Sequence, residues 1–136
     1  MVYSEVKIPV RYYETDQMGI VHHSNYIRYF ECARIHLMEE CGCPIEVCER
    51  LDSVTFPIVS VECRYRHPAR MGDVLTVTAQ IDALPLAKTF YTQKVFNQDG
   101  ILCAEGKVVV GSMDKITGKP LPCPQRIIDA FTNNFK

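Results

Sequence analysis

The sequence predicts an α+β fold in which a curved antiparallel sheet wraps around one long central helix. Three observations lead to this prediction. A single apolar stripe marks one helix of about five turns, segments on both sides of it alternate between apolar and polar residues as strands do, and short turn-rich connections join the later strands. The 136 residues match the usual size of one domain, so we expect a single domain over residues 1–136.

The first element is a strand over residues 5–12, where Val6, Ile8 and Val10 alternate with charged residues and Pro9. Proline donates no ladder hydrogen bond, so Pro9 favours an edge strand. Residues 13–23 break every periodicity and hold several polar groups and one glycine. We expect this segment to be an irregular loop of the kind that often carries chemistry.

The central helix is expected over residues 24–41. Ser24 is a suitable cap at its start. Gly42 stands where a left-handed residue ends a helix, and Pro44 follows it. The apolar stripe between these signals consists of Tyr26, Phe30, Ala33, Leu37 and Cys41.

Four strands are expected after the helix, over residues 56–65, 74–83, 89–96 and 101–113. Their short connections predict an antiparallel meander. A short amphipathic helix begins near Pro124. A sheet and a long helix that share one core in this way form the hotdog fold. The sheet edges still need cover, so we expect a homodimer or homotetramer.

Composition argues against several functions. The 15 basic and 16 acidic residues give a net charge of −1, which provides no bulk field to hold a nucleic acid. No apolar run approaches the ~20 residues that a membrane span requires, and the first residues lack the apolar core of a signal peptide. We therefore expect a cytoplasmic protein with no nucleic-acid partner and no membrane span.

Seven cysteines are present, an odd number, and none of them forms a Cys-x-x-Cys pair. This spacing argues against a structural zinc site, so no metal is expected. We interpret most of these residues as reduced, half-buried apolar side chains. They are Cys32, Cys41, Cys43, Cys48, Cys63, Cys103 and Cys123.

The polar loop lies immediately before the expected start of the helix, where unpaired backbone N–H groups favour negative charge. Such groups can stabilise an oxyanion. Asp16 lies seven residues before His23, and Gly19 allows the chain to bend between them. A carboxylate beside an oxyanion hole is what acyl transfer requires.

Each of these residues also has a purely structural interpretation. Asp16 in a loop commonly forms an Asx turn, and His22 or His23 before a helix is often a hydrogen-bonded structural group. Tyr13 fits a packed aromatic at a strand end. Glu14 is expected to face solvent.

Two segments resemble a known family. Tyr12-Tyr-Glu-Thr-Asp16-Gln-Met-Gly19-Ile-Val-His-His23-Ser-Asn25-Tyr26, continuing to Glu31-x-Ala33-Arg34, resembles the signature of the 4-hydroxybenzoyl-CoA thioesterase-like hotdog family. Tyr65-Arg-His-Pro68-Ala-Arg70-Met-Gly72-Asp73 resembles its second recurrent segment. The branch most similar to this chain is that of the short bacterial acyl-CoA thioesterases, including the Tol-Pal-associated ones.

The resemblance implies a role for each matching residue. Asp16 corresponds to the aspartate that acts as a nucleophile through a mixed anhydride or as a general base for water, and the sequence leaves both routes open. The backbone N–H of His23 would polarise the thioester carbonyl, with Gly19 and Asn25 shaping the site. His22 stands where the family commonly has an aromatic residue, and Tyr13 is a candidate pocket residue.

Coenzyme A would enter as part of the substrate, so no other cofactor is expected, and no Gly-rich nucleotide loop occurs. The resemblance implies that basic side chains hold the phosphates of coenzyme A. Arg64, Arg66, Arg70 and Lys88 are the candidates.

The sequence thus predicts an acyl-CoA thioesterase that releases a free acid and coenzyme A. Two alternatives keep the fold: a thioesterase acting on acyl-carrier protein, and a non-catalytic module that binds acyl groups. A hotdog dehydratase fits less well, because the segment from Asp16 to His23 resembles the thioesterase signature. The identity of the acyl group is not specified.

Overall fold

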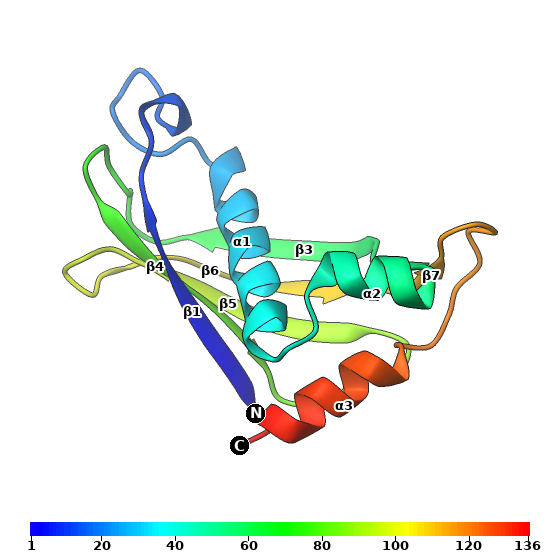
Figure 1. Cartoon of the computed structure of the whole chain (residues 1–136). Helices are drawn as coiled ribbons and strands as arrows, with labels where there is room; N and C mark the ends of the chain where they lie inside the picture. Colours follow the sequence, from blue (N-terminus) through cyan, green and yellow to red (C-terminus); the bar gives the residue numbers. More distant parts are fainter.

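The computed structural model describes residues 1–136, and its two termini lie side by side (Figure 1). The N–H of Lys136 donates to the carbonyl of Met1 over 2.8 Å. The elements in chain order are β1 (Val2–Pro9), the 3-10 turn η1 (Tyr12–Glu14), α1 (Ser24–Glu40), α2 (Ile45–Asp52), β2 (Val54–Thr55), β3 (Ile58–Tyr65), β4 (Val74–Ile81), β5 (Thr89–Phe96), β6 (Leu102–Val110), β7 (Met113–Asp114) and α3 (Gln125–Asn134).

Five strands form one antiparallel sheet in the order β1-β4-β5-β6-β3, and α1 lies across one face of it (Figure 1). The predicted hotdog architecture is confirmed. The predicted meander is correct only for β4, β5 and β6, because β3 pairs with β6 at the far edge. The connection after β3 crosses the sheet end, where the N–H groups of Arg66 and His67 both donate to the carbonyl of Cys103.

The central helix α1 confirms the expected span to within one residue. Its stripe packs against the sheet, and Phe30, Ala33 and Leu37 are fully buried. Gly42 follows the helix with a φ of +84°, a left-handed conformation that glycine adopts without steric strain. This burial holds α1 against the sheet and thereby fixes the position of its first turn.

Strand β1 is displaced from its predicted range, because it begins at Val2 and ends at Pro9. It is an edge strand, as Pro9 suggested, and it pairs only with β4. The chain leaves the sheet after Val10, whose N–H donates to the carbonyl of Asp73. Tyr12 therefore falls outside the strand and is 80% exposed.

Two features of the fold were not predicted from the sequence. Helix α2 occupies the predicted linker and buries Cys48. The predicted strand over residues 101–113 is interrupted at Gly111, whose N–H donates to the carbonyl of Pro57. The chain beyond that break forms β7, which pairs with β2 as a separate two-stranded sheet.

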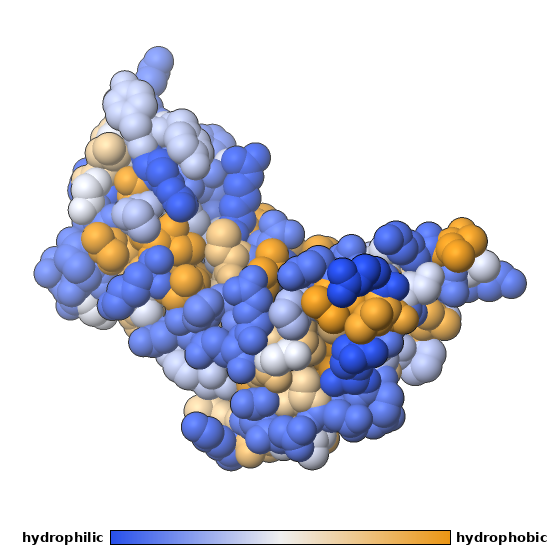
Figure 2. Space-filling view, viewed as in Figure 1, coloured by the Kyte–Doolittle hydropathy of each residue, from blue (hydrophilic) through white to orange (hydrophobic).

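Strand β3 is exposed along nearly its whole length. Its apolar residues Val59 and Val61 are 50% and 37% exposed. Apolar surface appears in the notch between α1 and α2, over the course of β3 (Figure 2). The strand lies very close to β6, because a Cβ on Gly106 would fall 1.9 Å from the carbonyl oxygen of Glu62.

All seven cysteines are free thiols, and Cys43, Cys48, Cys103 and Cys123 are buried. No group of three or more His, Cys, Asp or Glu side chains is arranged to hold a metal ion. None of the helices combines the length and the apolar character that a membrane crossing requires.

Candidate active site

The loop between β1 and α1 is a small hairpin over residues 14–22. At its base the N–H of His22 donates to the carbonyl of Glu14 over 2.9 Å, and higher up the N–H of Asp16 donates to the carbonyl of Ile20 over 2.8 Å. Gly19 closes the tip with a φ of +76°. The hairpin therefore presents Asp16 on one arm while the other arm runs directly into α1.

One carboxylate oxygen of Asp16 stabilises a turn, and the other is free to accept a hydrogen bond. Its Oδ1 accepts the N–H of Met18 over 2.8 Å, which is the Asx turn that a loop aspartate favours. Its Oδ2 accepts no hydrogen bond from the protein, and the residue is half-buried. The structural and the chemical interpretations of Asp16 are thus compatible, because each uses a different oxygen.

The start of α1 leaves one backbone N–H without a partner. The N–H of Ser24 donates to Nδ1 of His22 over 3.3 Å, and the N–H of Asn25 donates to the carbonyl of His22 over 3.0 Å. The N–H of Tyr26 donates to the carbonyl of His23. His23 precedes the first helical residue, and its own N–H donates to no protein atom.

Asp16 and His23 line the same open pocket of about 360 Å³. The hairpin forms one wall, the first turn of α1 forms the second, and the segment after β3 forms the third. The remaining lining residues are Met18, Ile20, Val21, Tyr26, Tyr65, Arg66, His67 and Pro68.

Two of the residues that line this pocket, Tyr26 and Tyr65, are aromatic and contact each other. The Tyr65 ring lies edge-on to Tyr26 at a centroid separation of 5.3 Å, and its hydroxyl donates to the carbonyl of His23 over 3.4 Å. Burial raises the pKa of both phenols, so both remain protonated at neutral pH. Tyr65 was not predicted as a site residue, although it begins the second segment that carries the family resemblance.

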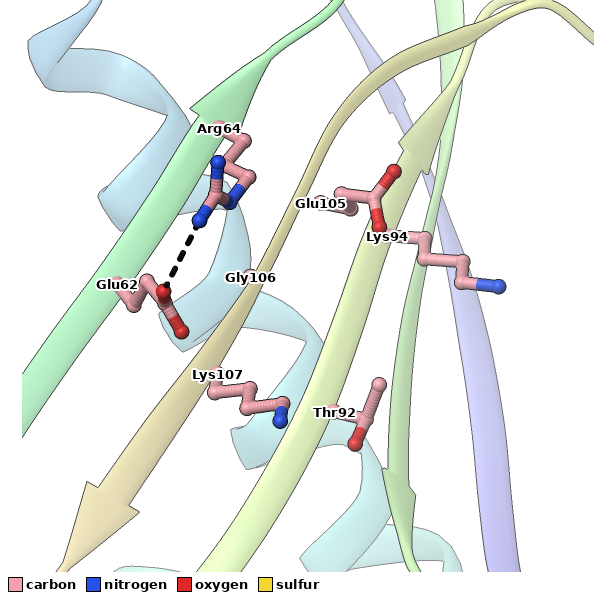
Figure 3. A pocket seen from close by; sticks show the side chains of 7 residues that line it. All are labelled: Glu62, Arg64, Thr92, Lys94, Glu105, Gly106 and Lys107. Atoms are coloured by element: carbon pink, nitrogen blue, oxygen red, sulfur yellow. Dashed lines mark ion pairs between the residues drawn. The ribbon is translucent and has the colours of Figure 1, made fainter.

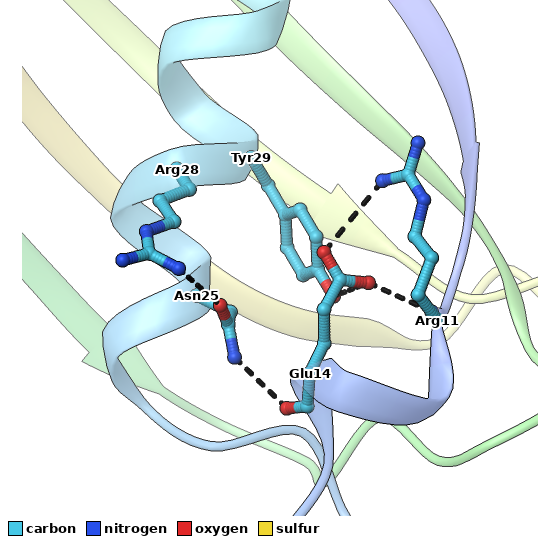
Figure 4. Close-up of polar contacts among 5 residues, drawn as sticks. All are labelled: Arg11, Glu14, Asn25, Arg28 and Tyr29. Carbon is cyan, nitrogen blue, oxygen red and sulfur yellow. Dashed lines mark hydrogen bonds and ion pairs between the residues drawn. The ribbon is translucent and has the colours of Figure 1, made fainter.

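Glu14 does not face solvent as the sequence suggested, because it is only 5% exposed. Its Oε1 accepts the N–H of Arg11 over 2.7 Å and the hydroxyl of Tyr29 over 3.0 Å (Figure 4). Burial and the neighbouring carboxylate both raise the pKa of Tyr29. The carbonyl of Glu14 also accepts Nδ2 of Asn25 over 2.8 Å, which ties the hairpin to the first turn of α1.

The four candidate cations for coenzyme A lie in different places. Arg66 lines the pocket. Arg70 is close to it, since its backbone pairs with Ile20. Arg64 lies in a charged groove on the face of the sheet opposite α1, 3.8 Å from Glu62 (Figure 3). Lys88 precedes β5 at the end of the sheet remote from the hairpin.

Tyr13 and His22 lie beside the pocket rather than in its wall. Tyr13 is 76% exposed and shares an adjacent hollow with Asp16 and Gly19. The ring of His22 lies against that of His23 at a centroid distance of 4.2 Å. These contacts give His22 a local capping role, because its Nδ1 already accepts the N–H of Ser24.

The fold and the pocket are those of a hotdog protein with an acidic loop in front of its central helix. The pattern of the thioesterase-like superfamily matches residues 10–131. The chain belongs to this superfamily.

Individual relatives agree with this membership. The acyl-CoA thioester hydrolase YbgC of Escherichia coli is 30% identical over 125 residues, which cover 90% of this chain and 92% of that protein. A hypothetical protein of Thermus thermophilus, TT1821, has a crystal structure with a TM-score of 0.88 and 34% identity, covering 98% of each chain. The DHNA-CoA thioesterase of Staphylococcus aureus shares the fold at a TM-score of 0.91 and 24% identity, covering 98% of this chain and 91% of that one.

Proposed function

We propose that this protein is an acyl-CoA thioesterase, which uses water to convert an acyl-CoA into a free acid and coenzyme A. The observation that carries the proposal is the pairing of two unsatisfied groups in one pocket: the free Oδ2 of Asp16 and the free N–H of His23. Superfamily membership and the similarity to YbgC support it.

In the proposed reaction, the thioester oxygen accepts the N–H of His23, which stabilises the negative charge that develops on it. Because this donor is fixed by the start of α1 and has no competing partner, it needs no rearrangement before the reaction. Asp16 lies across the pocket as the attacking or proton-accepting group.

Asp16 can act by two routes. As a nucleophile its carboxylate forms a mixed anhydride and expels the thiolate, and water then hydrolyses the anhydride. As a general base it removes a proton from the attacking water. After a single turnover in ¹⁸O-labelled water, label in Asp16 would identify the nucleophilic route with attack of water on the aspartyl carbonyl, because a general base exchanges no oxygen with the water.

Arg66 is the candidate that best fits a contact with the phosphates of coenzyme A. It lies on the pocket rim beside His67, and its guanidinium is half-exposed despite a 3.4 Å contact with Glu105. Arginine binds phosphate through paired donors, which suits this role. No cofactor besides water and these side chains is required.

We assign the chain to the short bacterial branch that includes the Tol-Pal-associated thioesterases. Its similarity to YbgC over nearly the full length of both proteins supports this assignment. We also propose a cytoplasmic location, because seven free thiols are typical of a protein in a reducing compartment.

We also propose that the active form is a homodimer joined through β3, or a homotetramer made of two such dimers. Strand β3 ends the sheet, so one edge of its backbone is unpaired, and Val59 and Val61 are exposed beside it. Unpaired edges associate readily. Tyr65 is the last residue of β3 and Arg66 follows it, so this contact would place the pocket at the subunit boundary.

The direct test incubates the purified protein with a panel of aromatic, short-chain and long-chain acyl-CoA esters and follows the loss of thioester absorbance. This readout avoids thiol reagents, which would also react with exposed Cys32. We expect hydrolysis of at least one ester. If acyl-carrier-protein thioesters are hydrolysed faster at equal concentration, the donor assignment is wrong, and binding without hydrolysis would indicate a non-catalytic module.

A further inference from the structure

Glu14 is the only buried acidic residue in the protein. Removing a carboxylate from water carries a large free-energy penalty unless hydrogen bonds compensate it. The nearest cation, the Arg11 guanidinium, is 3.6 Å away and half-exposed, so it compensates little. Its two hydrogen bonds, from the Arg11 N–H and the Tyr29 hydroxyl, therefore stabilise this carboxylate directly.

Those two hydrogen bonds connect parts of the chain that flank the candidate site. The Arg11 N–H belongs to the segment where the chain leaves β1, and the Tyr29 hydroxyl belongs to the second turn of α1. Tyr29 is 1% exposed, so its ring cannot shift without disturbing the core. The Glu14 side chain therefore joins the end of β1 to α1.

The backbone of Glu14 makes a second set of links. Its carbonyl accepts the N–H of His22, one residue before His23, and Nδ2 of Asn25, two residues after it. Figure 4 shows the Glu14 side chain pointing toward Tyr29 while its carbonyl points toward Asn25. One residue thus contacts the start of α1 at two different turns.

Asp16 lies two residues farther along the same arm of the hairpin, and its side chain is only half-buried. Nothing from the sheet or the helix holds its carboxylate directly, since the one protein donor to it is the N–H of Met18 in the same turn. Its position relative to the His23 N–H is therefore set by the hairpin, which is held at its base, where Glu14 lies, and along its second arm by backbone hydrogen bonds to the segment before β4.

We propose that Glu14 is a positioning residue for the thioesterase reaction: its buried carboxylate anchors the hairpin so that Asp16 and the His23 N–H meet the thioester together. This inference rests on the proposed function. Displacement of a reacting group by about 1 Å can reduce a rate about 100-fold, so an anchor two residues away has kinetic consequences.

Three variants separate positioning from general stability. Glu14→Gln keeps an oxygen that accepts both hydrogen bonds, and Glu14→Leu removes that acceptor while filling a similar volume. Gln93→Leu is the matched control, because Gln93 is fully buried and its Nε2 links the carbonyl of Phe30 in α1 to the sheet, remote from the hairpin. Unfolding in urea is measured for all three beside kcat and KM.

We expect Glu14→Leu to lower kcat about tenfold or more with little change in KM, because binding does not require the aligned carboxylate. Glu14→Gln should keep kcat within about threefold of the original protein, and Gln93→Leu should lose stability while keeping kcat. When Glu14→Leu is combined with Asp16→Asn, the two losses should not multiply, because the positioned group has already been removed.

Three results would overturn the inference. In the first, Glu14→Leu keeps the original kcat. In the second, Gln93→Leu at an equal loss of stability loses as much kcat as Glu14→Leu. In the third, the kcat losses of Glu14→Leu and Asp16→Asn multiply fully in the double variant. These outcomes require a parent protein that hydrolyses acyl-CoA. An inactive parent would instead refute the proposed function, so the two failures are distinguishable.

Discussion

At the scale of single residues, the pocket depends on a backbone group and not only on side chains. The His23 N–H donates to no protein atom, whereas the N–H groups of the residues next to it at the start of α1 each have an acceptor. An oxyanion donor of this kind survives replacement of its side chain. The side chain and the N–H of His23 can therefore be tested separately.

His23→Pro removes the N–H and His23→Ala retains it. Proline fits the local backbone, since His23 has a φ of −55° and proline is favoured at the first turn of a helix. Loss of one oxyanion donor lowers kcat about 100-fold or more, so we expect this for His23→Pro and a few-fold effect for His23→Ala. Steady-state kinetics of both variants, with circular dichroism as a check on folding, measure the difference. Equal activities would exclude the N–H as the oxyanion donor.

Single residues also show what the sequence could and could not predict. Asp16 lies seven residues before His23 with Gly19 between them, so the two could be expected to lie close together, and both line one pocket; their catalytic roles stay predictions. The burial of Glu14 could not be predicted, because an acidic residue in a polar loop is usually exposed and one of its partners, Tyr29, lies 15 residues away. Local sequence carries no signal for such a contact.

At the scale of elements, the same limit applies to strand order. The apolar alternation located each large strand to within a few residues, but it held no information on which strands pair. Strand β3 therefore lies next to β6 and not next to β4, the strand that follows it in the chain. Helix α2 was missed because it buries only Cys48, although Glu46 in its first turn and Arg50 in its last suit a helix dipole.

The exposed β3 gives a prediction for assembly. Val61→Lys places a charge in the apolar strip of the proposed dimer contact, and charges on edge strands oppose pairing. We expect its mass in solution, measured by light scattering after size exclusion, to fall to that of a monomer. Phe90→Lys is the control, because Phe90 is 64% exposed but lies on the interior strand β5. A dimer that persists in Val61→Lys would refute the β3 contact.

At the scale of the whole molecule, the buried thiols link stability to pH. Burial raises the pKa of Cys43 and of Cys123 to about 12. Both thiols bind their protons more tightly in the folded protein than in the unfolded chain, where the pKa of cysteine is about 8.5. Their contribution is fully present below that value and is lost as the pH rises toward 12.

We therefore expect the free energy of unfolding to fall steeply above about pH 9. Urea unfolding curves collected from neutral to alkaline pH measure this slope. A protein carrying both Cys43→Ala and Cys123→Ala should be less stable at neutral pH, because its core has small cavities, but it should show a flatter decline. An unchanged slope in that variant would assign the alkaline loss to other groups, such as the buried phenols of Tyr29 and Tyr91.

The measurement that tests the central claim most directly is kcat for Asp16→Asn on whichever acyl-CoA the original protein hydrolyses best. Asparagine keeps an oxygen for the N–H of Met18, so the hairpin should fold as before. We predict a loss of about 100-fold, equivalent to about 2.7 kcal/mol of transition-state stabilisation, with KM changed little. A folded Asp16→Asn protein with the original kcat would contradict the assignment of this pocket as a thioesterase active site.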